Sequence, residues 1–133
     1  MTKISFTVYG KPQPAGSKTG FPLPKKGGGT GVIIVDANPK AKSWQQEVRA
    51  AAAAAHDGPL LEGPVELFLL VNLVRPQVHF GTGGNSRKLK PSAPVYPASK
   101  PDLLKIARGI EDALTGLIYR DDAQIVIEGL RKV

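Results

Sequence analysis

The sequence predicts one α+β domain, in which a small mixed β-sheet supports two main helices. Strand-like and helix-like segments follow one another in the order strand, strand, helix, strand, helix, strand. The 133 residues are 41% hydrophobic, which is sufficient for one core, and no internal repeat divides them. We therefore expect residues 1–133 to form a single domain.

The first third of the chain contains two short strand patterns separated by a polar segment. Residues 4–8 alternate between apolar and polar side chains, which is typical of a half-buried strand. The segment 10–31 is rich in Gly, Pro and Lys, and it predicts a mobile basic loop. Residues 31–35 are mostly β-branched and predict the second strand.

A helix is predicted from Ser43 to about Ala55. Ser43 and Gln46 have the spacing of a capping box, which marks the start of a helix. The Gly-Pro pair at 58–59 ends it. Trp44 is expected to pack between this helix and the sheet.

The second half of the chain predicts a central strand, a long loop, a helix and a last strand. Residues 65–74 are the most apolar stretch, and their length suits a strand that is buried on both faces. Residues 75–100 form a long irregular segment, and such segments are usually functional or mobile. A helix over about 101–115 then ends at Gly116, and residues 124–130 predict the last strand.

The composition favours an intracellular protein that binds a polyanion. The formal charge is +7 and the pI is about 9.8, which favours partners such as nucleic acid. The absence of cysteine excludes disulfides and thiolate metal sites, and it suits the reducing cytoplasm. No apolar run is long enough for a signal peptide or a membrane span. No Gly-rich loop followed by Lys-Ser/Thr is present, so nucleotide hydrolysis is not indicated.

Acidic residues gather in the last third of this basic chain. Asp102 lies at the start of the second helix, where it can serve the helix dipole or a capping box with Ser99. Asp121 and Asp122 precede the last strand, where Asp is also common in turns. If the helix packs on the sheet and the chain returns, these acids converge at one end of the sheet. Converging carboxylates repel one another unless a cation lies between them, and Mg²⁺ prefers such ligands.

One apolar residue interrupts the polar arc of the second helix. On a helical projection, Leu104 falls between the directions of Arg108 and Glu111, opposite the apolar arc. Either another part of the protein packs over Leu104, or it replaces a polar group.

The same segments resemble a known family. The stretches 100–108 (KPDLLKIAR), 112–116 (DALTG) and 119–125 (YRDDAQI) are similar to RusA-type Holliday junction resolvases, and 9–14 (YGKPQP) resembles the opening of that family. These endonucleases are found largely in phages and prophages. The resemblance implies a homodimeric α+β fold. It also implies Mg²⁺-dependent cutting of branched DNA such as four-way junctions, with Mn²⁺ able to substitute, in the cytoplasm of a bacterium or an infected host.

The resemblance also implies roles for individual residues. Asp102 and Asp122 match the first and last acids of the family and would be metal ligands. Asp121 would be a further ligand or an orienting partner. Arg108 stands where the family often has a catalytic Lys, and it would neutralise charge on the phosphate.

Leu104 departs from the family pattern, because the family has its second acid at this position. Three explanations remain open. Glu111 supplies the missing carboxylate as a catalytic and metal-binding residue, or the site holds one metal with fewer ligands. In the third, the protein is a non-catalytic DNA-binding protein that retains junction binding with a degenerate metal site.

Basic residues outside the acidic segment are candidates for contacts with the DNA backbone. They share a positive charge in predicted loops or beside the acids, and they are Lys11, Lys18, Lys25, Lys26, Arg87, Lys88, Lys90 and Arg120. The simpler interpretation is a set of solvated charges. In that case the chain is a plain basic interaction domain, and its acids are only turn and cap residues.

Overall fold

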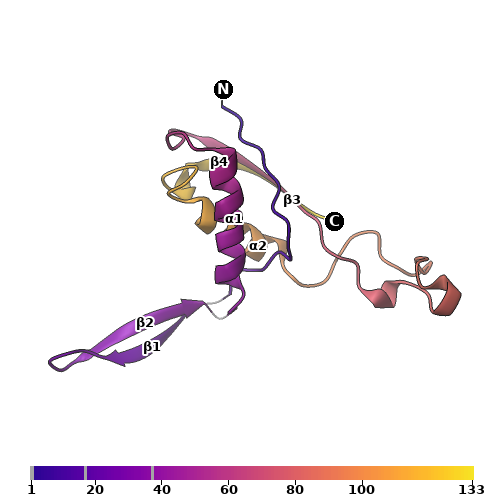
Figure 1. The fold of residues 1–133 in the computed structure, drawn as a ribbon, viewed down its shortest axis with the longest axis horizontal. Coiled ribbons are helices and arrows are strands. Elements are labelled where there is room, and N and C mark those ends of the chain that lie inside the picture. Colours follow the sequence, from indigo (N-terminus) through magenta and orange to yellow (C-terminus); the bar gives the residue numbers. More distant parts are fainter. Residues whose placement is uncertain (1, 17, 37) are drawn as a thin grey trace.

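The computed structural model describes residues 2–16, 18–36 and 38–133. Its elements in chain order are β1 (Lys18–Pro24), β2 (Thr30–Asp36), α1 (Ala41–Ala55), β3 (Val65–Val71), α2 (Leu103–Leu114) and β4 (Ile125–Lys132). Short 3₁₀ turns lie at Gln77–His79, Gly83–Asn85 and Asp122–Gln124. Figure 1 shows α1, α2, β3 and β4 together as a body, with the β1–β2 hairpin apart from it. The predicted α+β class with two main helices is confirmed.

The strands form two separate sheets, so the prediction of a single mixed sheet is wrong. β1 and β2 pair antiparallel, from Lys18 opposite Asp36 to Pro24 opposite Thr30. β3 and β4 pair in parallel, and the connection between them contains α2. This crossover is the usual way to join parallel strands, because a tight turn cannot bring them side by side.

The core lies between the two helices and one face of the β3–β4 sheet. α2 contacts both α1 and β4, and its side chains Ile106 and Ala113 are buried with Val48 of α1. Trp44 is also buried in this core, as predicted. Within the part of the chain that the structure describes, neither helix is long and apolar enough to cross a membrane.

The first predicted strand is present only as a pattern of burial. Ile4, Phe6 and Val8 are half-buried and pack against the core, while the residues between them are exposed. Among the described residues, however, none forms a strand ladder with 4–8. The alternation of apolar and polar residues over 4–8 thus identified the buried side chains correctly. A β-strand, however, also needs a neighbouring strand whose backbone pairs with its own by hydrogen bonds.

Two further predictions in the first half need correction. The expected loop 10–31 contains strand β1, which pairs with β2 across a turn where Gly27, Gly28 and Gly29 all have positive φ. Helix α1 begins at Ala41, two residues before Ser43, and its N-cap is Lys40. The side-chain oxygen of Asn38 accepts a hydrogen bond from the Lys40 backbone N–H at 3.1 Å. Asn38 therefore orders the approach to the helix that Ser43 was expected to cap.

Strand β3 is covered on one face only, contrary to the predicted burial on both. Val65, Leu67 and Leu69 are half-buried, whereas Phe68 and Leu70 are 68% and 62% exposed. The strand also ends earlier than predicted, at Val71, although the Leu73 N–H still donates to the Val133 carbonyl at 2.8 Å. Helix α2 packs on one side of the sheet and leaves the other side open.

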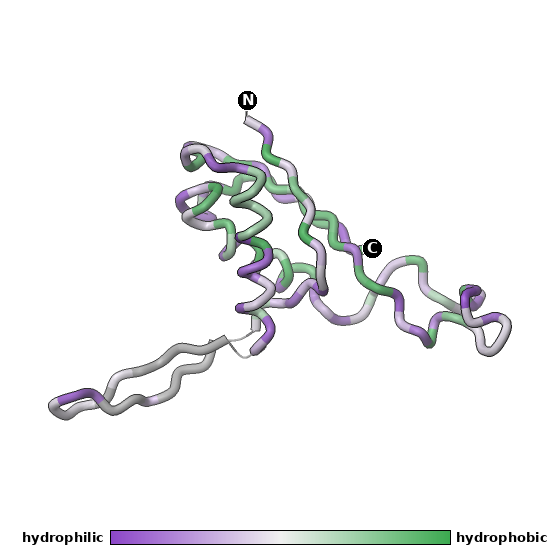
Figure 2. The backbone as a smooth tube through the Cα atoms, viewed as in Figure 1, coloured by the Kyte–Doolittle hydropathy of each residue, from purple (hydrophilic) through white to green (hydrophobic). Residues whose placement is uncertain are grey.

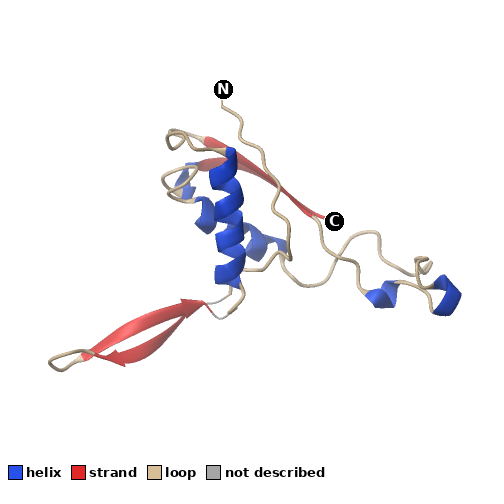
Figure 3. Cartoon of the chain, in the orientation of Figure 1, coloured by secondary structure: helices blue, strands red, loops and turns tan. Residues whose placement is uncertain are grey.

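The segment 72–101, here called the arm, is the predicted irregular stretch, and it extends from the end of β3 (Figures 1 and 3). Its own backbone holds it together: the Lys90 N–H donates to the His79 carbonyl at 2.9 Å, and Phe80 forms a bridge with Leu89. The Arg75 guanidinium donates to the Pro94 carbonyl at 2.7 Å. Hydrophilic and hydrophobic stretches alternate along the arm (Figure 2).

Two substitutions on α2 test its orientation. Ile106 is 0% exposed, so Ile106→Ala is expected to lower the free energy of unfolding by about 2–5 kcal/mol through lost burial and a residual cavity. Leu104 is 72% exposed, so Leu104→Ala is the matched control and should change it by no more than about 0.5 kcal/mol. Urea denaturation followed by circular dichroism measures both. Equal losses would contradict the packing described here.

Candidate functional site

Acidic side chains gather where the last turn of α2 meets the beginning of β4. Glu111 and Asp112 lie on that turn, Asp122 lies in the 3₁₀ turn that precedes β4, and Glu128 lies on β4 itself. The charges of Glu128, Asp122 and Asp112 all act on the Glu111 carboxyl. We refer to these four residues as the acidic cluster.

The environment of Glu111 favours its protonated form. Burial is the largest cause, followed by a hydrogen bond with the Glu128 carboxyl and then by the neighbouring negative charges. Together they raise the pKa of Glu111 from 4.5 to about 7. Below about pH 7 a proton on Glu111 therefore joins it to Glu128, and a bound cation would serve the same purpose.

Side chains from both sides fix the end of α2 on which Glu111 lies. The Tyr119 hydroxyl donates to the Glu111 carbonyl at 2.8 Å, and burial together with the Glu111 charge raises the pKa of Tyr119. The Arg49 guanidinium of α1 donates to the carbonyls of Ala113 and Thr115 at 2.8 and 3.3 Å. The Arg49 bonds satisfy carbonyls that a helix end otherwise leaves without partners, whereas the Glu111 carbonyl also accepts from the Thr115 backbone N–H at 3.1 Å.

Gln124 holds the Asp121–Asp122 pair in place. Its side-chain oxygen accepts hydrogen bonds from the backbone N–H groups of Arg120 and Asp121, at 2.9 and 3.1 Å. Its amide nitrogen donates to the carbonyls of Leu61 and Gly63, at 2.9 and 3.0 Å. Gln124 thus ties the acidic turn to the loop that leads into β3.

The two carboxyl groups of the pair differ. The Asp121 carboxylate accepts from the Ala123 backbone N–H at 2.8 Å, and this bond lowers the pKa of Asp121. A hydrogen bond with Asp121 raises the pKa of Asp122. The Asp121 carboxylate thus stabilises the turn, whereas the charge of Asp122 acts on Glu111 in the acidic cluster.

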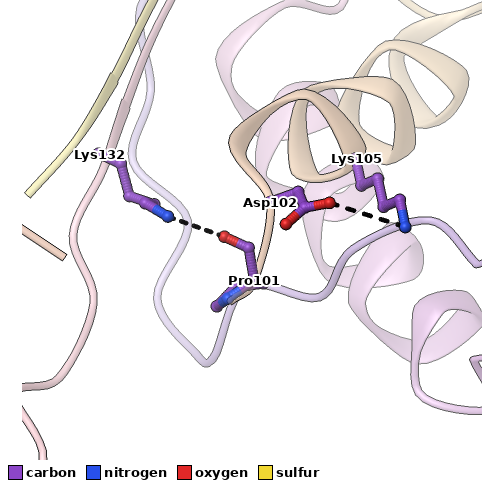
Figure 4. A network of polar contacts seen from close by, with 4 residues as sticks. All are labelled: Pro101, Asp102, Lys105 and Lys132. Carbon is purple, nitrogen blue, oxygen red and sulfur yellow. Dashed lines mark hydrogen bonds and ion pairs between the residues drawn. The ribbon is translucent and has the colours of Figure 1, made fainter. Parts of the chain in front are cut away.

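Asp102 lies in a different environment, beside two lysines (Figure 4). It is the N-cap of α2, and its carboxylate forms an ion pair with Lys105 at 3.7 Å. The Lys132 ammonium donates to the Pro101 carbonyl at 3.0 Å, as Figure 4 shows. It also donates to the Ser99 carbonyl at 2.8 Å. Lys132 thereby joins the approach to Asp102 to the last residue of β4.

Within one chain, Asp102 and Asp122 lie at opposite ends of β4, so the expectation that they converge at one end of the sheet is wrong. Lys132 at the end of β4 contacts the residue before Asp102, whereas Asp122 precedes the start of β4. The eight residues of the strand, at about 3.3 Å each, put roughly 23 Å between its ends. The cause is the parallel pairing, since α2 must run back along the sheet from the end of β3 to the start of β4.

Glu111, Leu104 and Arg108 are distributed along α2 between these ends. Leu104 and Arg108 are exposed on the outward face, one turn apart. Glu111 lies nearer the other end and joins the acidic cluster with Asp122. Among the acids predicted from sequence, therefore, the structure associates Glu111 with the Asp pair and leaves Asp102 apart.

The predicted DNA-binding residues are spread over the molecule. Lys25 and Lys26 lie in the turn of the β1–β2 hairpin, and Arg87, Lys88 and Lys90 lie on the arm. All five are exposed, as are Lys11 and Arg120 on the body. Lys18 begins β1, and its side chain lies outside the described part of the structure.

The acidic cluster offers carboxylate oxygens, the kind of donor atom that a divalent cation prefers. Carboxylate oxygens that raise one another's pKa are the ligands that Mg²⁺ favours. Over the residues that the structure describes, however, no three acidic or histidine side chains come together as a metal site.

Sequence analysis missed Glu128, Gln124 and Lys132. Gln124 follows Asp121 by three residues, and this capping-box spacing was a usable signal. Glu128 and Lys132 lie on the inner face of β4, and only the packing of α2 on that face shows what they contact.

A comparison with protein families decides the identity. The model of endodeoxyribonuclease RusA matches residues 8–133, which is nearly the whole chain. The chain belongs to the RusA endodeoxyribonuclease family. Family membership implies a nuclease of the Holliday junction resolvase type, which acts on branched DNA. The chain is also 32% identical over 129 residues to an uncharacterized protein, YqaN, of Bacillus subtilis (strain 168), covering 95% of this chain and 84% of that protein. No solved structure matches significantly.

The raised pKa of Glu111 predicts how the stability of this RusA-family protein depends on pH. Its pKa exceeds the ordinary 4.5, so folding favours the proton, and stability is lost as the pH rises from about 4.5 to about 7. In a chelator, Glu111→Gln should match the unsubstituted protein at about pH 4 and unfold at higher temperature at about pH 8. Differential scanning calorimetry measures both, with the exposed Glu47→Gln as control. Parallel profiles for the unsubstituted protein and Glu111→Gln would contradict this assignment.

Proposed function

We propose that the protein is a Mg²⁺-dependent endonuclease that cuts four-way DNA junctions by paired hydrolysis of phosphodiesters. The observation that carries this proposal is the family match over residues 8–133, which includes all the acids of the candidate site. The acidic cluster supports it, because its charges favour a bound cation. The net charge of +7 supports attraction of the DNA backbone.

Four acids are proposed to hold the metal. Asp122 and Glu111 would contribute from the acidic cluster, Asp121 would be a further ligand or orient Asp122, and Asp102 would contribute from the start of α2. When bound, the cation supplies positive charge that activates an attacking water and stabilises the leaving oxygen. Mn²⁺ is proposed to substitute for Mg²⁺.

Arg108 is proposed to act on the phosphate directly. It lies exposed on the outward face of α2, one turn from Leu104 and within the helix that joins the two acidic ends. Its guanidinium can neutralise the charge that develops on a phosphate in the transition state. It cannot donate a proton, because arginine stays protonated in proteins.

The exposed basic residues are proposed to bind the DNA backbone at several places. Two separate parts of the chain that extend from the body carry these residues (Figure 1). The hairpin turn carries Lys25 and Lys26, and the arm carries Arg87, Lys88 and Lys90. Lys11, Lys18 and Arg120 would add contacts nearer the body. A substrate with several arms offers phosphates in more directions than a straight duplex, which suits this distribution.

A homodimer is part of the proposal. Because Asp102 and Asp122 lie at opposite ends of β4 in one chain, a centre that uses both has to combine acids from two copies. A twofold axis would make two such centres, and these would produce paired nicks in a symmetric junction.

The hydrolytic proposal is tested by nicking of a synthetic four-way junction in Mg²⁺. Asp102→Asn and Asp122→Asn are each expected to reduce the rate by at least about 100-fold, since even partners of metal ligands contribute ten- to hundredfold. Asp57→Asn, in an exposed loop after α1, is the matched control and should retain full activity. Full activity of Asp102→Asn or Asp122→Asn would remove that residue from the site.

Leu104 favours a second candidate, a non-catalytic junction-binding protein. Its side chain is 72% exposed beside Asp102, where the family has an acid. For this candidate, junction binding occurs without nicking, and Asp102→Asn leaves binding unchanged. Leu104→Asp is then expected to restore nicking, because it adds a carboxylate two residues from Asp102.

A further inference from the structure

A short segment of the arm, residues 94–99, presents an exposed aromatic side chain. Tyr96 is 57% exposed, and Val95 beside it is 79% exposed. Both lie outside the hydrophobic core that the helices and the β3–β4 sheet enclose. We call residues 94–99 the tyrosine loop. Because neighbouring exposed apolar side chains mark interaction sites, the tyrosine loop is a candidate surface for a partner.

Hydrogen bonds from two basic side chains fix the tyrosine loop at both of its ends. Arg75, near the beginning of the arm, donates to the Pro94 carbonyl at 2.7 Å. Lys132, at the end of β4, donates to the Ser99 carbonyl at 2.8 Å. Between these points the ring of Pro97 fixes one further backbone angle. A partner that binds the loop therefore has little conformational freedom to remove, which favours binding.

The charge of the arm selects the chemistry of this partner. Residues 72–101 contain five Lys or Arg residues and no Asp or Glu, so the surroundings of the tyrosine loop attract a polyanion. A polyanion that also offers flat faces to an aromatic ring is a nucleic acid with unpaired bases. Bases within a continuous duplex are stacked on one another, so their faces are not free. The tyrosine loop thus fits DNA whose stacking is interrupted, as it is at a branch.

We propose that Tyr96 stacks on an unpaired base at the branch point of the DNA substrate. This inference rests on the binding of branched DNA in the proposed function and specifies which part of that DNA the arm recognises. The phenol ring lies on the flat face of the base, while the cations of the arm contact the phosphates on either side. Because stacking uses no base edge, Tyr96 distinguishes a branch from a duplex without selecting a base sequence.

The position of the tyrosine loop in the chain places this contact near Asp102. Tyr96 precedes Asp102 by six residues, which span at most about 22 Å. Lys132 also donates to the carbonyl of Pro101, the residue before Asp102, and so joins the end of the loop to the start of α2 (Figure 4). With about 3.4 Å between successive nucleotides of a strand, a base on Tyr96 lies within about six nucleotides of a phosphate at Asp102.

Fluorescence anisotropy in EDTA tests the contact without metal and therefore without cutting. The labelled probes are a four-way junction, a single strand of thymidines and a duplex of the same length. Tyr96→Ala is expected to raise the dissociation constants for the junction and the single strand at least about fivefold, because one stacked base contributes this much. The constant for the duplex should stay within about twofold, and Tyr96→Phe, which keeps a ring, should stay within about twofold for every probe.

Val78→Ala is the matched control for Tyr96→Ala. Val78 is also an exposed apolar residue of the arm, at 69%, but it has no ring to stack on a base. Full affinity of Tyr96→Ala for both unpaired probes overturns the proposal, and so do equal losses for junction and duplex. Loss of self-association by Tyr96→Ala with unchanged DNA binding also overturns it, and assigns the loop to a second copy of the chain. Circular dichroism of each variant checks that it folds.

The outcomes separate the stacking contact from the nuclease. A protein that binds the unpaired probes through Tyr96 but never nicks a junction retains this contact and loses the proposed activity. A protein that nicks junctions, and whose Tyr96→Ala variant binds every probe normally, retains the activity and loses the contact. An unsubstituted protein that binds neither the junction nor the single strand overturns the contact outright.

Discussion

The packing of α2 between α1 and the inner face of the β3–β4 sheet is the constraint on which the rest of the structure depends. Ile106 and Ala113 of α2 are buried there with Val48 of α1. Because β3 and β4 are parallel, α2 has to return along the full length of the sheet between them. The helix therefore carries polar residues from one end of the sheet to the other, and the acids of the candidate site lie near its two ends.

This geometry divides the acids into two environments with opposite electrostatics. Asp102 at the start of α2 is paired with Lys105 and lies beside the backbone carbonyls that Lys132 holds. At the other end, Glu111 and Asp122 lie near other carboxyl groups. Burial raises the pKa of Glu111 most and a hydrogen bond with Asp121 raises that of Asp122 most, and repulsion adds to both shifts. A cation stabilises the second environment most, while a phosphate is attracted to the lysines of the first.

Family membership and the structure support each other at the turn before β4. The family match covers this turn, and the structure gives a physical reason for its sequence. Asp121 closes the turn with a hydrogen bond from the Ala123 N–H, and Gln124 uses both ends of its amide to hold the turn against the loop before β3. The charge of Asp122, the next residue, acts on Glu111 in the acidic cluster.

The sequence by itself determined the class of the fold, the position of both helices, the last strand and the family. These features depend on local patterns: the apolar arc of α2, the positive φ that Gly116 adopts after it, and the motif 119–125. Only the tertiary structure decided that the strands form two sheets, that one face of β3 is open, and that Glu128 joins Glu111. It also separated Asp102 from Asp122, because the distance between residues far apart in sequence depends on strand direction and helix packing, which periodicity does not encode.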